Sequence, residues 1–105
     1  MEKTMSNPRH LLVIDAMPDM AQFEAVIACF AKITAVFEGH GATNLQRLRT
    51  VQQVIGDAEV MATAIFEFPD SESIERALAS ADFSALSETR DQVYKAFALR
   101  ICEGH

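Results

Sequence analysis

Apolar and polar residues alternate most regularly in segment 59–70, Glu-Val-Met-Ala-Thr-Ala-Ile-Phe-Glu-Phe-Pro-Asp. In a strand of period two, one side carries only apolar residues and the other is still half apolar. A strand with apolar residues on both faces is usually central in its sheet. Pro69 cannot donate a ladder hydrogen bond, so we expect the strand to end there, with Asp70 or Ser71 capping a helix.

Similar patterns predict the elements on either side. Residues 10–15 form an expected first strand, followed by a turn in which Asp19 is a plausible helix cap. Residues 20–38 are expected to form the longest helix, ended by Gly39 or Gly41. A short helix after Asp70 and a recapped turn at 80–86 follow. A helix, or a helix and then a loop, over 87–95 and a last strand over 96–102 complete the chain. The apolar stripe of the long helix comprises Phe23, Val26, Ile27, Phe30, Ile33, Thr34 and Phe37.

Residues 42–55 allow two interpretations. Leucine and valine recur every three residues from Leu45 to Val54, which favours a helix. Thr43, Thr50 and the Val and Ile residues favour a strand, and a bulge near Arg49 would restore alternation. Gly56 and Asp57 predict a turn into the next strand. We therefore interpret this segment as a bent strand.

The resulting order is βαββαβ, a ferredoxin-like α+β fold with an antiparallel sheet in which the third strand lies beside the first. Residues 1–9 are expected to form a flexible tail and residues 10–105 a single domain. Right-handed crossovers place both helices on one face of the sheet. The other face would still carry Leu11, Val13, Met61 and Ile65, each worth about 1.5–3 kcal/mol when buried. We therefore expect a homodimer formed through this face, with Arg100 in an ion pair across the interface.

Composition limits the possible partners. The 105 residues include 15 acidic and 9 basic ones, for a net charge of -6, and there is no Lys/Arg run. Binding to nucleic acid or to an anionic membrane is therefore disfavoured. We expect no apolar stretch to approach the length of a transmembrane helix. Cys29 and Cys102 lie far apart in the sequence, which is typical of reduced thiols and indicates a cytoplasmic protein.

Few residues suggest chemistry. Glu67, near the end of the central strand, would act as a base if its pKa were raised, although pairing with an arginine is the commoner outcome. His40 lies between two glycines in a turn, where a proton shuttle or a plain exposed histidine is possible. Arg90 could bind a carboxylate or bridge to Glu67 or Asp91. No spacing of ligands predicts a metal site and no motif predicts a cofactor.

Short motifs add a family resemblance. Phe66–Ser71, Ala79–Leu86, Thr89-Arg90-Asp91 and the Gly-His-Gly at 39–41 resemble the bacterial domain-of-unknown-function family "thirteen-thirty". That family belongs to the dimeric α+β barrel superfamily. The resemblance implies a sheet-to-sheet dimer and a cleft between sheet and helices, and Arg90 matches an arginine of the family. Where the family tends to have tyrosines on the first helix, this chain has Phe23 and Phe30.

Three functions remain open at this point. The first is binding of a small organic molecule in the cleft, with Phe23, Phe30, Arg90 and Tyr94 as candidate contacts. The second is a cofactor-free enzyme, similar to a monooxygenase, dehydratase or isomerase, that acts on a small carbonyl or phenolic compound. The third is a structural or regulatory interaction module that needs no cleft.

Overall fold

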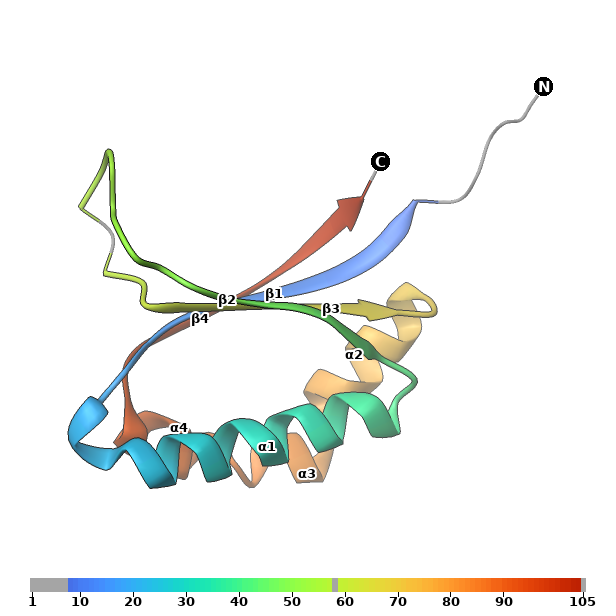
Figure 1. Ribbon diagram of the computed structural model, residues 1–105. Helices are drawn as coiled ribbons and strands as arrows, with labels where there is room; N and C mark the ends of the chain where they lie inside the picture. Colours follow the sequence, from blue (N-terminus) through green and yellow to red (C-terminus); the bar gives the residue numbers. More distant parts are fainter. Residues whose placement is uncertain (1–7, 58, 105) are drawn as a thin grey trace.

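A computed structural model describes residues 8–57 and 59–104 of the chain. Its strands form one antiparallel sheet in the order β2-β3-β1-β4 (Figure 1). The strands are β1 (Arg9–Pro18), β2 (Thr43–Arg49), β3 (Ala62–Phe68) and β4 (Tyr94–Gly104). The third strand lies beside the first and pairs on its other side with β2. The ferredoxin-like α+β fold and the central position of β3 are therefore confirmed.

All helices lie on one face of the sheet, as right-handed crossovers require (Figure 1). They are the 3-10 helix η1 (Met20–Gln22), α1 (Phe23–Gly39), α2 (Ser71–Ala79), α3 (Ala81–Ser84) and α4 (Ser87–Val93). Side chains of Asp19, Asp70 and Ser80 accept hydrogen bonds from backbone N–H groups in the first turns of η1, α2 and α3. These three caps agree with the sequence pattern and fix where each helix begins.

The end of α1 depends on a glycine in the left-handed region. Gly41 has φ +90°, and an added Cβ would lie 3.1 Å from Cγ of Pro69. His40 is the C-cap residue, and its backbone N–H donates to the carbonyl oxygen of Phe37 at 3.0 Å. Of the two expected glycines, Gly41 therefore ends the helix, whereas Gly39 is still helical.

Aromatic side chains fill the space between the sheet and the C-terminal half of α1. Phe37 is fully buried. Its ring centroid lies 5.1 Å from that of Phe66, 5.7 Å from that of Phe68 and 5.5 Å from that of Phe83. Edge-to-face and stacked pairs at these distances are attractive beyond their burial. Leu12, Ile33 and Ile74 are also in this core.

The segment with two interpretations is a strand, but a shorter one than expected. β2 spans Thr43–Arg49, and its register shifts between Asn44 and Gln46, so the bulge is at Leu45 and not near Arg49. No ladder pairing is assigned to described residues from 50 to 61, although Thr50 N–H donates to the Met61 carbonyl oxygen at 2.7 Å. β3 accordingly begins at Ala62, later than residue 59. The three-residue periodicity does not mark a helix.

The first and last strands are longer than expected. β4 begins at Tyr94, which the sequence pattern places in the segment 87–95 before the strand, and continues to Gly104, beyond residue 102. A register shift pairs Pro18 with Tyr94 but Met17 with Ala96, so Lys95 is an extra residue in β4. β1 runs from Arg9 through Pro18, into the turn expected at residues 17–19. Residues 1–7 of the expected tail, and His105, lie outside the described residues.

Arg100 makes its ion pair inside the chain. On the face of the sheet away from the helices, called here the outer face, Asp15 Oδ2 pairs with Arg100 Nη1. Asp15 Oδ1 accepts a hydrogen bond from the Thr63 hydroxyl at 2.7 Å. β1 lies between β3 and β4, so one carboxylate contacts both neighbouring strands. Arg100 thus has a partner within its own chain, and its ion pair across a dimer interface stays a prediction.

One helix is more apolar than we expected. By length and composition alone, the helical segment Met20–Gly39 could cross a membrane. In its most apolar stretch of 18 residues, 22% is buried. The expectation that no segment reaches spanning length is therefore wrong for this one. In the fold, this segment packs on the sheet through Val26, Cys29, Ile33 and Phe37.

Candidate functional site

A cleft separates the N-terminal half of α1 from the sheet. Its volume is about 640 Å³, within the range of small-molecule pockets. The sheet contributes the small residues Ala16, Ala62 and Ala64, which do not reach the helix as the phenylalanines of the core do. Phe23 and Ile27 of α1 line the cleft and remain 52% and 53% exposed. The apolar stripe of α1 thus packs into the core at one end and borders an open cleft at the other.

Polar groups reach this cleft from its two sides. Arg47 and Arg49 of β2 line one side, and Cζ of Arg47 lies 4.9 Å from the ring centroid of Phe30. Tyr94 of β4 lines the other side and is 9% exposed. Burial raises the pKa of Tyr94 to about 12. Its phenol therefore stays protonated at neutral pH, where the hydroxyl can donate and accept hydrogen bonds but cannot serve as a base.

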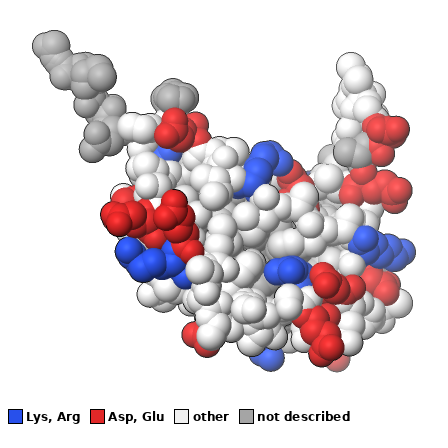
Figure 2. All heavy atoms as spheres, turned by 180° about the vertical axis from the view of Figure 1, so that it is seen from behind, with Lys and Arg blue, Asp and Glu red and all other residues white. Residues whose placement is uncertain are grey.

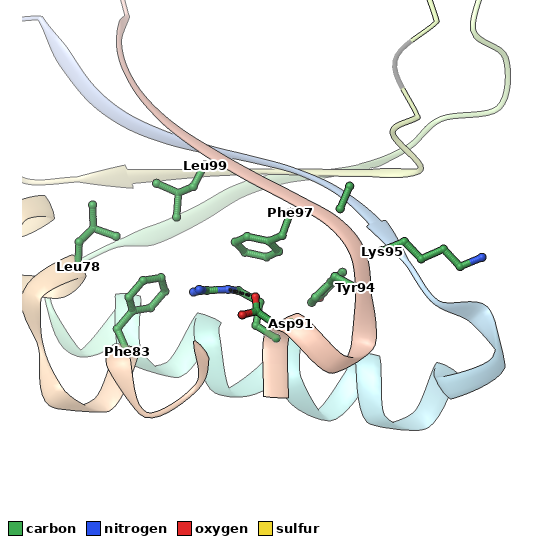
Figure 3. Close-up of a pocket in the computed structure, with 9 residues that line it drawn as sticks. Leu78, Phe83, Asp91, Tyr94, Lys95, Phe97 and Leu99 are labelled. Carbon is green, nitrogen blue, oxygen red and sulfur yellow. Dashed lines mark ion pairs between the residues drawn. The ribbon is translucent and has the colours of Figure 1, made fainter. Parts of the chain in front are cut away.

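Arg90 lies in a second depression, along β4. This depression has a volume of about 590 Å³ and is bordered by α3, α4 and β4. The guanidinium carbon of Arg90 lies 5.5 Å from the ring centroid of Phe83 and 5.2 Å from that of Phe97. Figure 3 shows Phe83, Phe97 and Asp91 around this depression. The guanidinium thus makes cation–π contacts with two rings of its own chain.

Only part of the Arg90 hypothesis is met. Its Nε lies 3.9 Å from Asp91 Oδ1, one of the two bridges that we considered, and Glu67 is not its partner. The position of Arg90 is therefore explained by its aromatic and acidic neighbours.

Seen from behind, acidic side chains gather towards the two sides of the molecule and much of the middle is uncharged (Figure 2).

Glu67 is paired with an arginine. Its carboxylate accepts hydrogen bonds from Arg9 Nη2 at 2.9 Å and from Arg9 Nε at 3.1 Å. The hydrogen bond from Arg9 lowers the pKa of the Glu67 carboxyl, opposite to the raised pKa that a base would need. The favoured interpretation, pairing with an arginine, is therefore confirmed, and the less favoured one, a raised pKa, is wrong. Glu67 lines a shallow depression with His10 and Pro69, apart from the cleft.

The candidate residues do not converge on one place. His40, half-buried at the end of α1, lines none of the three depressions described here. Glu67 and Arg90 line two different ones, and neither lines the cleft. Phe23, Phe30 and Tyr94 do line it. Within residues 8–57 and 59–104, no group of His, Cys, Asp and Glu side chains is arranged to hold a metal ion.

The arginines of β2 are the functional candidates that sequence reasoning missed. Arg47 and Arg49 are two residues apart, so a strand places them on one face. That signal was present in the sequence. It was hidden because the bulge was expected near Arg49, where it would interrupt the alternation between the two arginines, whereas the register shifts at Leu45.

Comparisons with known proteins support the fold. The family described as "Domain of unknown function (DUF1330)" matches residues 11–105. A protein of unknown function from Rhodopseudomonas palustris is 17% identical over 93% of this chain and 82% of that one, with a TM-score of 0.72. A putative antibiotic biosynthesis monooxygenase from Caulobacter crescentus is 11% identical over 93% and 91%, also with a TM-score of 0.72.

A third similar structure has a ferredoxin-like fold. It is a dabb family protein from Mesorhizobium loti, 14% identical over 91% of this chain and 96% of that one, with a TM-score of 0.69. No curated protein matches the sequence. At these identities the likeness shows the shared fold and does not carry an activity to this chain.

Proposed function

Since the chain belongs to the family of domains of unknown function DUF1330, we propose a function from its own geometry: it binds a small, mainly apolar organic molecule in the cleft between α1 and the sheet. One observation carries this proposal. Phe23 and Ile27 stay more than half exposed beside a cavity of about 640 Å³. Burying such a side chain fully is worth about 1.5–3 kcal/mol, so a ligand that covers both gains affinity from their desolvation.

Binding is better supported than catalysis. The cleft holds a tyrosine that stays protonated at neutral pH and two arginines, whereas Glu67, His40 and Arg90 do not line it. A cofactor-free enzyme would need a base or nucleophile in contact with its substrate. The third possibility, an interaction module without a ligand, does not explain why α1 keeps apolar side chains over a cleft.

A pair of matched substitutions on α1 tests the proposal. Ala31 lines the cleft, whereas Ala28, one turn earlier and also exposed, does not. We expect Ala31→Phe to fill part of the cleft and to weaken binding of the neutral dye Nile red by about tenfold or more, a loss of about 1.4 kcal/mol. Ala28→Phe should bind the dye as wild type does. Equal affinity in all three proteins, or no saturable binding by wild type, would overturn the proposal.

We further propose that the chain forms a homodimer through the outer face. Leu11 and Ile65 are only half-buried on this face. Next to it, the loop between β2 and β3 carries Val51, Val54 and Ile55, which are between 78% and 86% exposed. Figure 1 shows this loop rising on the side of the sheet away from the helices. Apolar side chains on both the face and the loop would be covered by a second copy.

Sedimentation velocity at micromolar concentration tests the homodimer. We expect a dimer for wild type and a shift towards monomer for Val54→Asp, because the new charge would be desolvated in the interface. Gln52→Asp adds the same charge to an exposed position of the same loop and should remain dimeric. A wild-type monomer refutes the proposal. A fully dimeric Val54→Asp would show that the loop is not part of the dimer interface.

The thiols support the proposed cytoplasmic location. Cys29 and Cys102 are both free, with Cys29 buried and Cys102 half-buried. Free thiols are typical of reducing compartments. Fractionation of cells that express the full chain would check this location.

A further inference from the structure

Two arginines border the cleft along the edge strand β2. Arg47 is opposite Ala64 and Arg49 is opposite Ala62 in the ladder with β3. Residues two apart on a strand project from the same face, and here that face carries the small alanines over the cleft. The cleft therefore has a cationic side within an otherwise mainly apolar lining.

The guanidinium of Arg47 is oriented by Phe30. Its Cζ lies 4.9 Å from the ring centroid, so the cationic group lies over the aromatic ring. An arginine has five N–H donors around the edge of its plane, and a cation–π contact does not use them as hydrogen bonds do. A planar carboxylate can meet such an edge with two parallel hydrogen bonds.

Neither arginine is neutralised within the described part of the chain. Ion pairs there join Arg9 to Glu67, Arg90 to Asp91 and Arg100 to Asp15. Arg47 and Arg49 make none among residues 8–57 and 59–104. In a chain of net charge -6, an apolar cleft would thus present positive charge at the β2 side.

We propose that the ligand of the cleft is an amphipathic carboxylate, bound by Arg47 and Arg49 at its anionic end and by Phe23 and Ile27 along its apolar body. This inference rests on the proposed function and specifies the ligand class of the same cleft. A carboxylate anywhere else in the cleft would be desolvated without a cation, which is costly. A cavity of about 640 Å³ suits a medium-chain acid or an acid with one or two rings.

Two ligands that differ only at the head group test the inference. Octanoate and octanamide have the same alkyl chain, and each is used near neutral pH to displace Nile red. We expect wild type to bind octanoate about tenfold or more tightly than octanamide, since hydrogen bonds to charged groups are the stronger class. Added salt should reduce this preference because the arginines are exposed.

Glutamine variants assign the preference to the two arginines. Arg47→Gln and Arg49→Gln should each weaken octanoate binding and leave octanamide binding unchanged, and the double variant should lose the preference. Arg76→Gln is the control, because Arg76 is an exposed arginine of α2 that does not line the cleft. Unchanged octanamide binding also shows that each variant is folded.

The outcomes separate this inference from the proposed function. Equal binding of octanoate and octanamide, or a preference that persists in the double variant, overturns the inference while the cleft remains a binding site. Absence of Nile red, octanoate and octanamide binding overturns both. A preference lost in the double variant but kept in Arg76→Gln supports the assignment to the cleft.

Discussion

Phe23 and Phe37 belong to the same predicted stripe of α1, and the structure assigns them opposite energetic roles. Phe37 is fully buried with its ring against three other aromatic rings, whereas Phe23 is 52% exposed at the cleft. Replacing a buried Phe by Ala typically costs about 3–5 kcal/mol. We expect Phe37→Ala to lose about 4 kcal/mol, since aromatic pairs are lost as well as volume. Phe23→Ala should lose about 1 kcal/mol or less because the exposed half of its ring gains no water on unfolding.

Urea unfolding measures this difference. The chain has no tryptophan, so far-UV circular dichroism is the suitable signal. All proteins are compared at one concentration, because self-association makes apparent stability depend on concentration. A domain of ordinary stability has about 5–15 kcal/mol in total, so Phe37→Ala could fail to fold. The milder pair Phe37→Leu and Phe23→Leu then keeps the test available, with expected losses of about 1–2 kcal/mol and near zero.

The result that refutes this account is equal destabilisation at the two positions. It would mean that α1 packs on the sheet along its whole length and that the cleft is not open. Nile red binding by the Phe23 variants provides an independent check, since Phe23 lines the cleft and Phe37 does not. A stable Phe23→Ala with weakened dye binding would agree with both the packing and the proposed function.

Three further predictions concern other parts of the chain. Gly39→Ala should raise the melting temperature slightly, because Gly39 is helical and an added Cβ would lie in open space. Gly41→Ala should lower it, because Gly41 has φ +90° and an added Cβ would meet Pro69. The reverse order of melting temperatures would contradict the assigned helix end. Arg90→Lys should destabilise the fold by about 1 kcal/mol in urea unfolding, since a lysine cannot stack on two rings as a planar guanidinium does; an unchanged midpoint would show that the stacking is unimportant. Asp15→Asn should reduce stability near neutral pH, with a difference from wild type that narrows in acid.

The sign of the Asp15 effect follows from its surroundings. Burial by itself raises the pKa of the Asp15 carboxyl, but hydrogen bonds from Thr63 and Arg100 outweigh it and hold the pKa below the ordinary 3.8. A depressed pKa stabilises the fold above the unfolded value and ceases to do so as pH falls through the folded value. Unfolding midpoints across this acid range should therefore converge for Asp15→Asn and wild type. A constant difference at all pH values would argue against an ionised Asp15.

The fold could be predicted because local signals agreed with one another. Alternation in β3, the broad stripe of α1 and the caps at Asp19, Asp70 and Ser80 all favoured one element order. The ends of the strands were harder to predict from the sequence. Tyr94 begins β4 because a bulge at Lys95 resets the register, and nothing in the local alternation signals an extra residue.

The site was harder to predict because it depends on which parts of a pattern remain unpacked. Phe23 and Phe37 are equivalent in the apolar stripe, and only the residues opposite them decide their burial. Phe66 and Phe68 fill the space under one end of the sheet, while the alanines of β1 and β3 leave it open at the other. An arginine was the favoured partner of Glu67, but that arginine is Arg9, which the sequence pattern placed in a tail. Such long-range pairing is not encoded in spacing.

The membrane-like hydropathy of α1 has a physical explanation in this fold. A helix that only covers a sheet needs one apolar stripe, and its other residues are free to be polar. α1 borders both a packed core, through Ile33 and Phe37, and a cleft, through Phe23 and Ile27. Its apolar surface is therefore wider than a core alone requires. Polar residues at Phe23 and Ile27 would cost the fold little because both are more than half exposed, so their apolar character favours the proposed binding of an apolar molecule.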